Sequence, residues 1–140
     1  MKKKIALFAV SALALVALIS ATVVLSLYGV FDVFDNTING EFSIEDHTVY
    51  KIMFDVEHIE EFIYLGKIDD ISELRKQAQK IWIDEYGIEV RLNQRPYKVL
   101  YDPEHDLYLV SGSLDSAFGG VANIFVERET GRVLAVWHEK

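Results

Sequence analysis

The sequence predicts a small α+β domain in which one main amphipathic helix packs on an antiparallel sheet, preceded by an N-terminal transmembrane or signal helix. Three observations support this prediction. Residues 5–27 form an apolar run without a charge, directly after three lysines. Residues 71–86 repeat their apolar side chains with the period of a helix, and the segments after residue 97 have the short patterns of strands joined by turns. A helix followed by a run of strands is the order expected of an α+β domain.

The N-terminal run is long enough to cross a membrane. At about 1.5 Å per residue, a helix over residues 5–27 is roughly 35 Å long, and a hydrocarbon core is about 30 Å thick. Because Lys2, Lys3 and Lys4 favour the cytoplasm, the domain after them is expected to be extracytoplasmic. We therefore predict a retained single-pass signal anchor over residues 1–31, with membrane contact through residues 5–27 and a cytoplasmic N-terminus.

A cleaved secretory signal is the alternative, and it would leave the domain secreted or periplasmic. Signal peptides usually have a shorter apolar stretch, about 7–15 residues, followed by a small-x-small cleavage site. A cut after Ala21 would place Ile19 at the third-last position, and a cut after Ser26 would place Val24 there. Both residues are bulky for that position, which favours the retained anchor.

The pattern changes twice between the leader and the main helix. Residues 32–40 are polar and contain Asn, Thr and Gly, which predicts a linker before a domain over residues 41–140. Residues 41–54 alternate between apolar and polar side chains and predict strand character, including a possible hairpin. Residues 56–66 then follow a helical period, which predicts a short amphipathic helix that ends at Gly66.

The helix over residues 71–86 is the best-defined element. Its apolar face consists of Ile71, Leu74, Ala78, Ile81 and Trp82, and its polar face of Arg75, Lys76, Gln79, Lys80 and Asp84. Asp70 can cap the first turn, with Glu73 as its capping-box partner. Gly87 stands where a left-handed residue commonly ends a helix.

Two hairpins are predicted after this helix. Their strands are residues 98–101, 107–113, 121–127 and 132–138. Residues 102–106 and 128–131 have the composition of turns, and Gly131 can take a positive φ. Apolar side chains on both sides of these strands indicate that both faces of the sheet are covered, one of them by the helix.

Charge and composition exclude several classes of function. All 22 acidic residues lie after residue 31, against 11 of the 14 basic residues. Such a domain repels nucleic acid and attracts basic partners or cations. The chain has no cysteine, so it can have no disulfide, zinc–thiolate site or thiol nucleophile. We expect no nucleic-acid partner.

The sequence shows no catalytic residue, metal site or cofactor site. The four histidines are not spaced as metal ligands, and G-x-S-x-G, P-loop and dinucleotide motifs are absent. Asp102, Glu104 and Asp106 alternate within one turn, but Pro103 and the lack of a following bidentate Glu favour an acidic hairpin tip over a calcium loop. The candidate partner-binding residues are acidic: Asp55, Glu57, Glu60, Glu61, Asp102, Glu104 and Asp106.

A series of short motifs then follows in a distinctive order. The motifs are Glu85-Tyr86-Gly87, Arg95-Pro96-Tyr97, the V-x-G-x-L of residues 110–114, Gly119-Gly120-Val121 and Thr130-Gly131-Arg132-Val133-Leu134. Over residues 70–140 this order resembles the NTF2-fold immunity proteins of bacterial polymorphic toxin systems. The leader and residues 41–69 depart from that family's pattern.

The resemblance implies an NTF2-like α+β domain that binds and neutralises a cognate toxin and is not an enzyme. It also implies that the motif residues determine the fold and do not contact the toxin; these residues are Tyr86, Gly87, Pro96, Gly112, Gly119, Gly120 and Gly131. Together with the leader, it suggests a membrane-anchored domain whose acidic face blocks a basic toxin that acts on the cell envelope.

Two other functions stay open. A helix followed by strands that end in E-T-G-R-V-L also resembles PepSY-type domains, so an extracytoplasmic regulator that binds a protease is the main alternative. A small-ligand-binding or enzymatic NTF2-like cone is a further one, and it rests on the fold alone.

Overall fold

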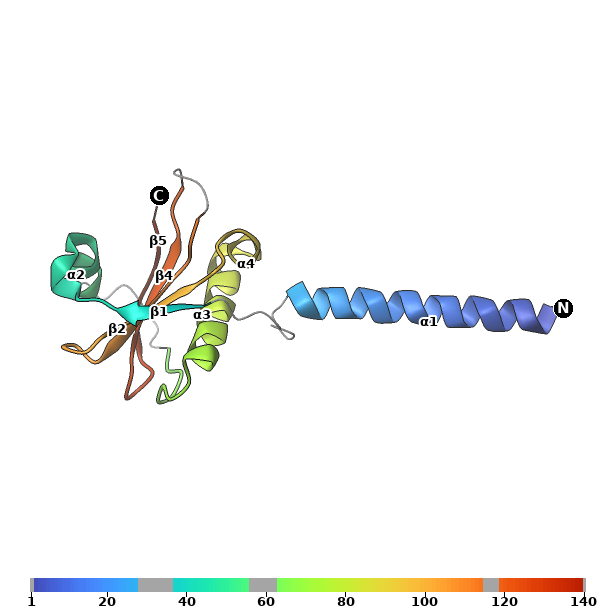
Figure 1. The fold of residues 1–140 in the computed structure, drawn as a ribbon, viewed down its shortest axis with the longest axis horizontal. Coiled ribbons are helices and arrows are strands. Elements are labelled where there is room, and N and C mark those ends of the chain that lie inside the picture. The colour runs from blue at the N-terminus through green and yellow to red at the C-terminus, as the bar shows by residue number, and fades with distance from the viewer. Residues whose placement is uncertain (1, 28–36, 56–62, 115–118, 140) are drawn as a thin grey trace. The chain divides into compact units, whose positions relative to one another are not determined.

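The computed structural model describes residues 2–27, 37–55, 63–114 and 119–139, with side chains in the first of these ranges described for residues 11–25. The chain divides into two compact units, Met1–Phe34 and Asp35–Lys140, and each is described by itself. Elements are labelled in Figure 1.

The first unit contains one continuous helix, α1, over Lys2–Leu27 (Figure 1). Its described side chains are exposed, and apolar ones such as Leu13 and Leu18 are 72% and 66% exposed. In the parts of the chain that the structure describes, no helix meets the length and apolarity needed to cross a membrane. The helix expected in the leader is therefore present, and its transmembrane assignment stays a prediction.

The second unit is built on a five-stranded sheet. The strands are β1 (Ile38–Glu41), β2 (Lys98–Asp102), β3 (Leu107–Ser111), β4 (Ala122–Glu127) and β5 (Val133–His138). Their order in the sheet is the same as their order along the chain. β1 runs parallel to β2, and the other neighbours are antiparallel. The two predicted hairpins are confirmed, with strand ends within two residues of those expected.

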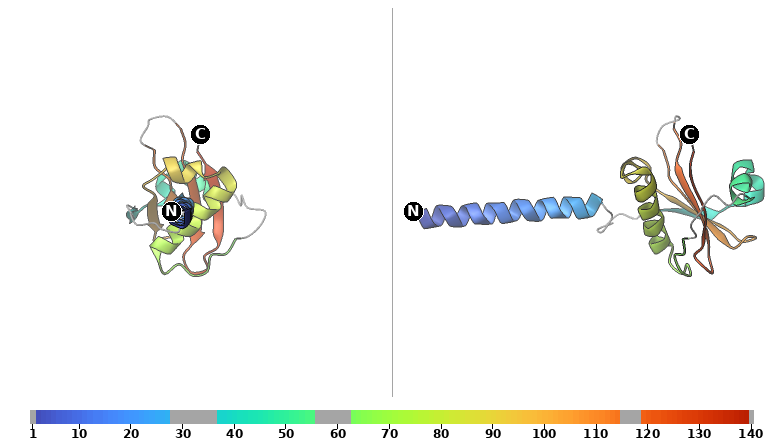
Figure 2. Two further views of the ribbon diagram at one scale, coloured as in Figure 1. Left: turned by 90° about the vertical axis from the view of Figure 1, so that its right-hand side faces the viewer. Right: turned by 180° about the vertical axis from the view of Figure 1, so that it is seen from behind.

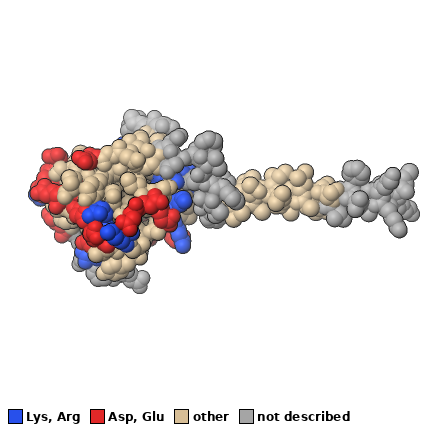
Figure 3. Space-filling view, turned by 60° about the horizontal axis from the view of Figure 1, so that its bottom comes forward, with Lys and Arg blue, Asp and Glu red and all other residues tan. Residues whose placement is uncertain are grey.

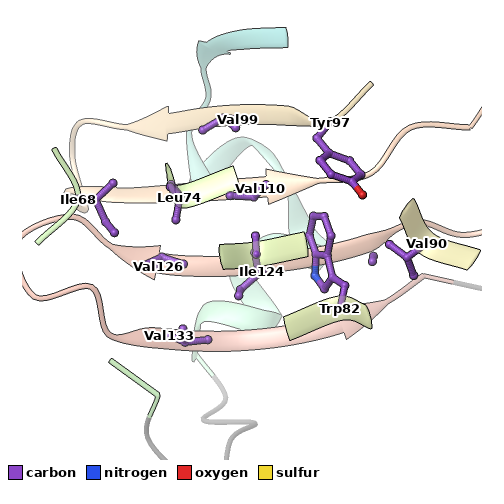
Figure 4. Close-up of a cluster of buried hydrophobic side chains, with 12 residues drawn as sticks. Ile68, Leu74, Trp82, Val90, Tyr97, Val99, Val110, Ile124, Val126 and Val133 are labelled. Atoms are coloured by element: carbon purple, nitrogen blue, oxygen red, sulfur yellow. The ribbon is translucent and has the colours of Figure 1, made fainter. Parts of the chain in front are cut away.

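The main helix, α3 (Ile71–Tyr86), covers one face of the sheet, and the short helix α4 (Glu89–Asn93) follows it (Figures 1 and 2). As predicted, Asp70 caps α3 by accepting hydrogen bonds from two backbone N–H groups, and Gly87 follows its last turn with φ 89°. Leu74 and Trp82 pack on apolar strand residues in a buried cluster (Figure 4). This cluster forms the larger part of the core.

A second cluster covers the opposite face. A 3-10 turn, η1 (Ile44–Asp46), and the helix α2 (Thr48–Asp55) lie on the side of the sheet away from α3 (Figure 1). Ile44 is fully buried there against Phe125 and other strand residues, and Tyr50 packs edge-on to Phe125. Both faces of the sheet are thus covered, as the apolar residues on both sides of the strands predicted.

Residues 41–54 are mostly helical, so the predicted strand or hairpin is wrong there. Tyr50, Met53 and Phe54 pack on the sheet and are spaced as one face of a helix, whereas Ile52 is 55% exposed. The alternation of Tyr50, Ile52 and Phe54 fitted a strand equally well, because so short a segment supports either period.

Two further expectations differ from the structure. Residues 38–40, expected in the linker, form most of β1, because Ile38 N–H donates to the Tyr97 carbonyl and begins a parallel pairing. Residues 63–65, expected at the end of a helix, pair instead with the β4–β5 hairpin, and Gly66 after them has φ 79°. The rest of that predicted helix, residues 56–62, lies outside the described residues.

The polar face predicted for α3 is partly wrong. Arg75 and Gln79 are buried, with 2% and 3% of their surfaces exposed. Gln79 Oε1 accepts a hydrogen bond of 3.0 Å from the Tyr97 hydroxyl, which compensates the burial of its amide. Helical periodicity identifies the covered face, but it does not predict that polar residues beside that face find buried partners.

Candidate functional site

An extended segment, residues 63–65, forms an outer edge beside the β4–β5 hairpin. Leu65 N–H donates to the Gly131 carbonyl at 2.8 Å, and Val133 N–H donates to the Ile63 carbonyl at 2.9 Å. Tyr64 lies opposite Arg132 in this antiparallel bridge. Because the bonds flank the Tyr64–Arg132 pair, the N–H and C=O of Tyr64 point away from the hairpin. Neither group has a backbone partner within the described chain.

Two glycines allow this close approach. Gly131 has φ 67°, and a Cβ at that position would collide with the Gly66 backbone. Gly66 has φ 79°, but a Cβ there would meet no atom within 4 Å. The glycine of the Thr130-Gly131-Arg132 motif is therefore required both by its conformation and by the segment that passes over it.

A hollow of about 630 Å³ lies between this segment and α3; we call it the α3-side hollow. Ile63, Tyr64, Leu65 and Ile81 supply its apolar lining, and Glu73, Lys76, Gln77, Lys80 and Asp84 supply its polar lining. Tyr64 is 62% exposed. Lys76 and Lys80 form no ion pair with the described residues. The Gln77 Oε1 atom is buried and accepts no hydrogen bond there.

A smaller hollow, of about 310 Å³, lies on the other side of the sheet; we call it the α2-side hollow. Phe54 and Leu134 are its apolar residues, and Asp55, Glu127 and Arg132 are its charged ones. Arg132 is also the residue opposite Tyr64, so the edge at Tyr64 lies between the two hollows. The α3-side hollow presents two lysines and two carboxylates, and the α2-side hollow presents two carboxylates and one arginine.

The acidic surface is concentrated on one side of the second unit. Residues 37–55 and 98–106 together contain seven acidic residues, six of them at least partly exposed, and two basic ones, whereas residues 71–95 contain four acidic and five basic ones. Figure 3 shows Asp and Glu gathered at the end of the domain where α2 and the β2–β3 turn lie in Figure 1. Val49 and Ile52 project from α2 on this side, each 55% exposed.

Only part of the predicted acidic set is available to a partner. Asp55 and Glu104 are exposed, whereas Glu57, Glu60 and Glu61 lie outside the described residues. Asp102 is fully buried, so its assignment as a partner-binding residue is wrong. Turn residues are normally exposed, and nothing local in the sequence distinguishes this one.

The Asp102 carboxylate holds several backbone groups together. Its oxygens accept hydrogen bonds from the N–H groups of Ile44 at 2.9 Å, Glu104 at 2.9 Å and His105 at 3.1 Å, and one oxygen lies 3.0 Å from His105 Nδ1. Burial disfavours the charged form, but these hydrogen bonds outweigh it and hold the pKa of Asp102 below its ordinary value. Asp102 thereby joins η1 to the β2–β3 turn.

Asp106 is also used inside the domain. It has φ 51°, and its carboxylate accepts hydrogen bonds from Arg128 Nε at 2.7 Å and from the Tyr101 hydroxyl. Asp102, Glu104 and Asp106 therefore do not converge on one point. In the described part of the chain, no group of three His, Asp or Glu residues could hold a metal ion.

Two of the motif residues, Gly112 and Tyr86, lie beside a contacting pair, His138 and the buried Gln94, of which sequence reasoning missed Gln94. Its Oε1 accepts from Ala122 N–H at 2.7 Å, and its Nε2 lies 3.0 Å from His138 Nε2. A Cβ on Gly112 would collide with the Gln94 side chain. Tyr86 packs edge-on to His138 at 5.4 Å. The remaining motif residues include Pro96, two residues after Gln94, and Gly119 and Gly120 just before β4, with Gly119 at φ 112°.

Comparison with known proteins connects this arrangement to a family. A family model described as NTF2 fold immunity protein matches residues 76–140, from α3 to the end of the sheet. The resemblance predicted from the motifs of residues 70–140 is thereby confirmed. The mixed fold, with helices packed against a five-stranded sheet, fits an NTF2-like domain. No curated protein and no solved structure matches the chain.

Proposed function

We propose that this chain is an immunity protein that binds and neutralises a cognate toxin. The observation that supports this function is the match of residues 76–140 to the NTF2 fold immunity proteins. The family implies a protein toxin as partner and a role without catalysis. A stoichiometric binder needs a stable, accessible surface and no catalytic residues, which agrees with the open edge and hollows described above.

The same proposal places the domain outside the cytoplasm on a membrane anchor. Its support is the sequence of the leader, in which Lys2–Lys4 precede the apolar residues 5–27. A toxin that acts on the envelope would meet the domain there. Cleavage of the leader, which would release the domain from the membrane, remains the alternative.

The partner is proposed to be basic. The seven acidic residues of segments 37–55 and 98–106 give one side of the domain a negative potential. Opposite charge on the toxin would accelerate association and disfavour other partners. Asp55 and Glu104 are the exposed members of the predicted acidic set that would act in this way.

Co-expression tests the function. Each secreted toxin encoded next to this chain is produced in a host with and without the full-length chain, and survival is counted. We expect the chain to protect against one of them and to co-purify with it from membranes in stoichiometric amount through a C-terminal tag. A chain truncated before Gly131 is the control, because it lacks β5. Protection against none of the toxins, with no co-purified toxin, would refute the proposal, and a co-purified protease would favour the regulatory alternative.

A further inference from the structure

The edge at Tyr64 has hydrogen-bonding capacity that the described residues of the domain do not use. Residues on either side of Tyr64 bond to the hairpin, so the outward N–H and C=O of Tyr64 are those that a further strand would pair with. The adjoining Tyr64 ring is mostly exposed, and aromatic residues of this kind are frequent at protein interfaces. A partner strand placed here would extend the sheet beyond β5 and residues 63–65.

The two hollows define the chemistry of such a strand. Successive side chains of a strand point to opposite faces of a sheet. On one face they would enter the α3-side hollow, where Lys76 and Lys80 are without an ion pair in the described chain. On the other face they would approach the α2-side hollow, with Asp55 and Glu127. Glu73 and Asp84 also line the α3-side hollow, so that hollow has no excess of positive charge. The fitting segment therefore alternates, with polar or apolar side chains on the α3 side, where an acidic one can pair with Lys76 or Lys80, and basic or apolar side chains on the α2 side.

We propose that the toxin is bound by strand addition, with an extended segment of this alternating type paired to the Tyr64 backbone between the two hollows. This inference rests on the proposed function and specifies its contact surface. A basic side of the added strand also agrees with the basic toxin proposed above.

The opposite edge of the sheet is less suitable. β1 is only four residues long, contains Gly40 and ends in Glu41. Short edge strands, glycine and charged residues all disfavour the addition of another strand. The Tyr64 edge, in contrast, has an exposed aromatic residue and a hollow on each side.

The first test separates the Tyr64 backbone from its side chain. Tyr64→Ala removes the ring and keeps the N–H, whereas Tyr64→Pro removes both. The residue before a proline prefers an extended conformation, which is compatible with the antiparallel pairing of the Ile63 carbonyl to Val133. We expect Tyr64→Pro to bind the neighbouring toxin about fivefold or more weakly than Tyr64→Ala, the loss of roughly one hydrogen bond. Affinity is measured with the full-length chain in detergent.

A second pair of variants does not alter the backbone. Lys80→Glu reverses a charge inside the α3-side hollow, and Lys98→Glu reverses an exposed charge on β2 as a matched control. We expect Lys80→Glu to weaken toxin binding about three- to tenfold, and Lys98→Glu, which makes the acidic side more negative, not to weaken it. If Tyr64→Pro does not fold, the outcome is decided by the Lys80→Glu and Lys98→Glu pair and by hydrogen exchange at the Tyr64 amide of the wild-type chain. This exchange should slow in the complex.

The outcomes distinguish the two proposals. If the wild-type chain neither binds nor neutralises any neighbouring toxin, the proposed function and this inference both fail. If the wild type protects, but Tyr64→Pro equals Tyr64→Ala and Lys80→Glu equals Lys98→Glu, the function stands and strand addition is excluded. The edge is established as the contact surface if Tyr64→Pro binds more weakly than Tyr64→Ala and Lys80→Glu binds more weakly than Lys98→Glu. Hydrogen exchange at the Tyr64 amide should then also be slower in the complex.

Discussion

The carboxylate of Asp106 lies 2.7 Å from Arg128 Nε and connects the turn between β2 and β3 to the turn between β4 and β5. A backbone bond reinforces the connection, because Arg128 N–H donates to the Asp106 carbonyl at 3.0 Å. Arg128 also contacts Glu129 at 2.7 Å, and Glu129 lies 3.4 Å from Lys67. The charged groups at this end of the sheet thus form one network.

This network predicts a loss of stability in acid. The hydrogen bond from Arg128, followed in size by that from Tyr101, lowers the pKa of Asp106. Burial alone would raise the pKa of Asp102, but the hydrogen bonds to its carboxylate lower it. A carboxyl group whose pKa is lower in the folded state stabilises the fold above its unfolded pKa, here 3.8, and loses that contribution as the pH falls through the folded value. Thermal unfolding of the full-length chain should therefore show a midpoint that falls below about pH 4. Asp106→Asn should show a smaller fall, and an equal fall in both proteins would contradict the role of Asp106.

A double-mutant cycle at Gln94 tests the packing of the motif glycines. Gln94→Ala leaves the buried Ala122 N–H without its acceptor, which should cost about 1–3 kcal/mol of unfolding free energy. Gly112→Ala should destabilise by collision with the Gln94 side chain. The double variant should lose less than the sum of the two, with a coupling of about 1 kcal/mol, because the first change removes the nearest obstacle, Gln94 Oε1, and leaves only the Cβ of residue 94 at 3.0 Å. Additive losses in urea unfolding would show that Gly112 is required for another reason.

Gly131 and Gly66 form a matched pair for the edge segment. Both have positive φ, so alanine is strained at either position, but only Gly131 lacks space for a Cβ. We expect Gly66→Ala to cost about 1–2 kcal/mol of unfolding free energy, and Gly131→Ala about 3 kcal/mol or more. Hydrogen exchange at the Leu65 amide should also become faster in Gly131→Ala alone, since that amide bonds to the Gly131 carbonyl. Equal effects of the two changes would contradict the close approach.

The acidic side should govern how fast the toxin associates. Asp55→Asn combined with Glu104→Gln removes two exposed charges there, and Glu85→Gln combined with Glu89→Gln removes two exposed charges on the α3–α4 side. The first pair should slow association and weaken its salt dependence, while the second pair leaves both nearly unchanged. Stopped-flow association at several salt concentrations measures this. Each pair should alter stability by no more than about 1 kcal/mol, as is usual for surface changes.

The leader predicts membrane association that survives alkaline extraction. Full-length chain should remain in the membrane fraction, and protease added outside the cytoplasm should digest the domain. A variant without residues 5–27 should appear in the soluble fraction. If the full-length chain is itself found free and shortened, the leader is a cleaved signal and not an anchor.

Much of the second unit could be predicted from the sequence because its signals are local. Asp70 and Gly87 mark both ends of α3, and the two hairpins have turn residues between short apolar segments. Residues 48–55 were harder, because eight residues with an apolar side chain at most positions satisfy both the strand and the helix period. Their helical form is decided by packing on Phe125 and its neighbours, which lie far along the chain.

The candidate site depends on contacts that no local pattern contains. Tyr64 becomes part of an open edge only because Arg132 lies opposite to it. Asp102 is indistinguishable in the sequence from the exposed Glu104, yet it is buried because Ile44 and His105 direct hydrogen bonds toward it. The acidic composition correctly indicated a charged surface, but it did not show which carboxylates the fold uses internally.

The pairing of residues 63–65 with the β4–β5 hairpin has a consequence for the order in which a growing chain matures. Residues 63–65 are synthesised well before Gly131 and Val133, the residues they bond to. Until the ribosome has added those residues, the segment has no hairpin to pair with and the hollows on either side of Tyr64 do not exist. A nascent chain therefore lacks this edge, and under the strand-addition proposal it could engage a toxin there only after the last hairpin has joined the sheet.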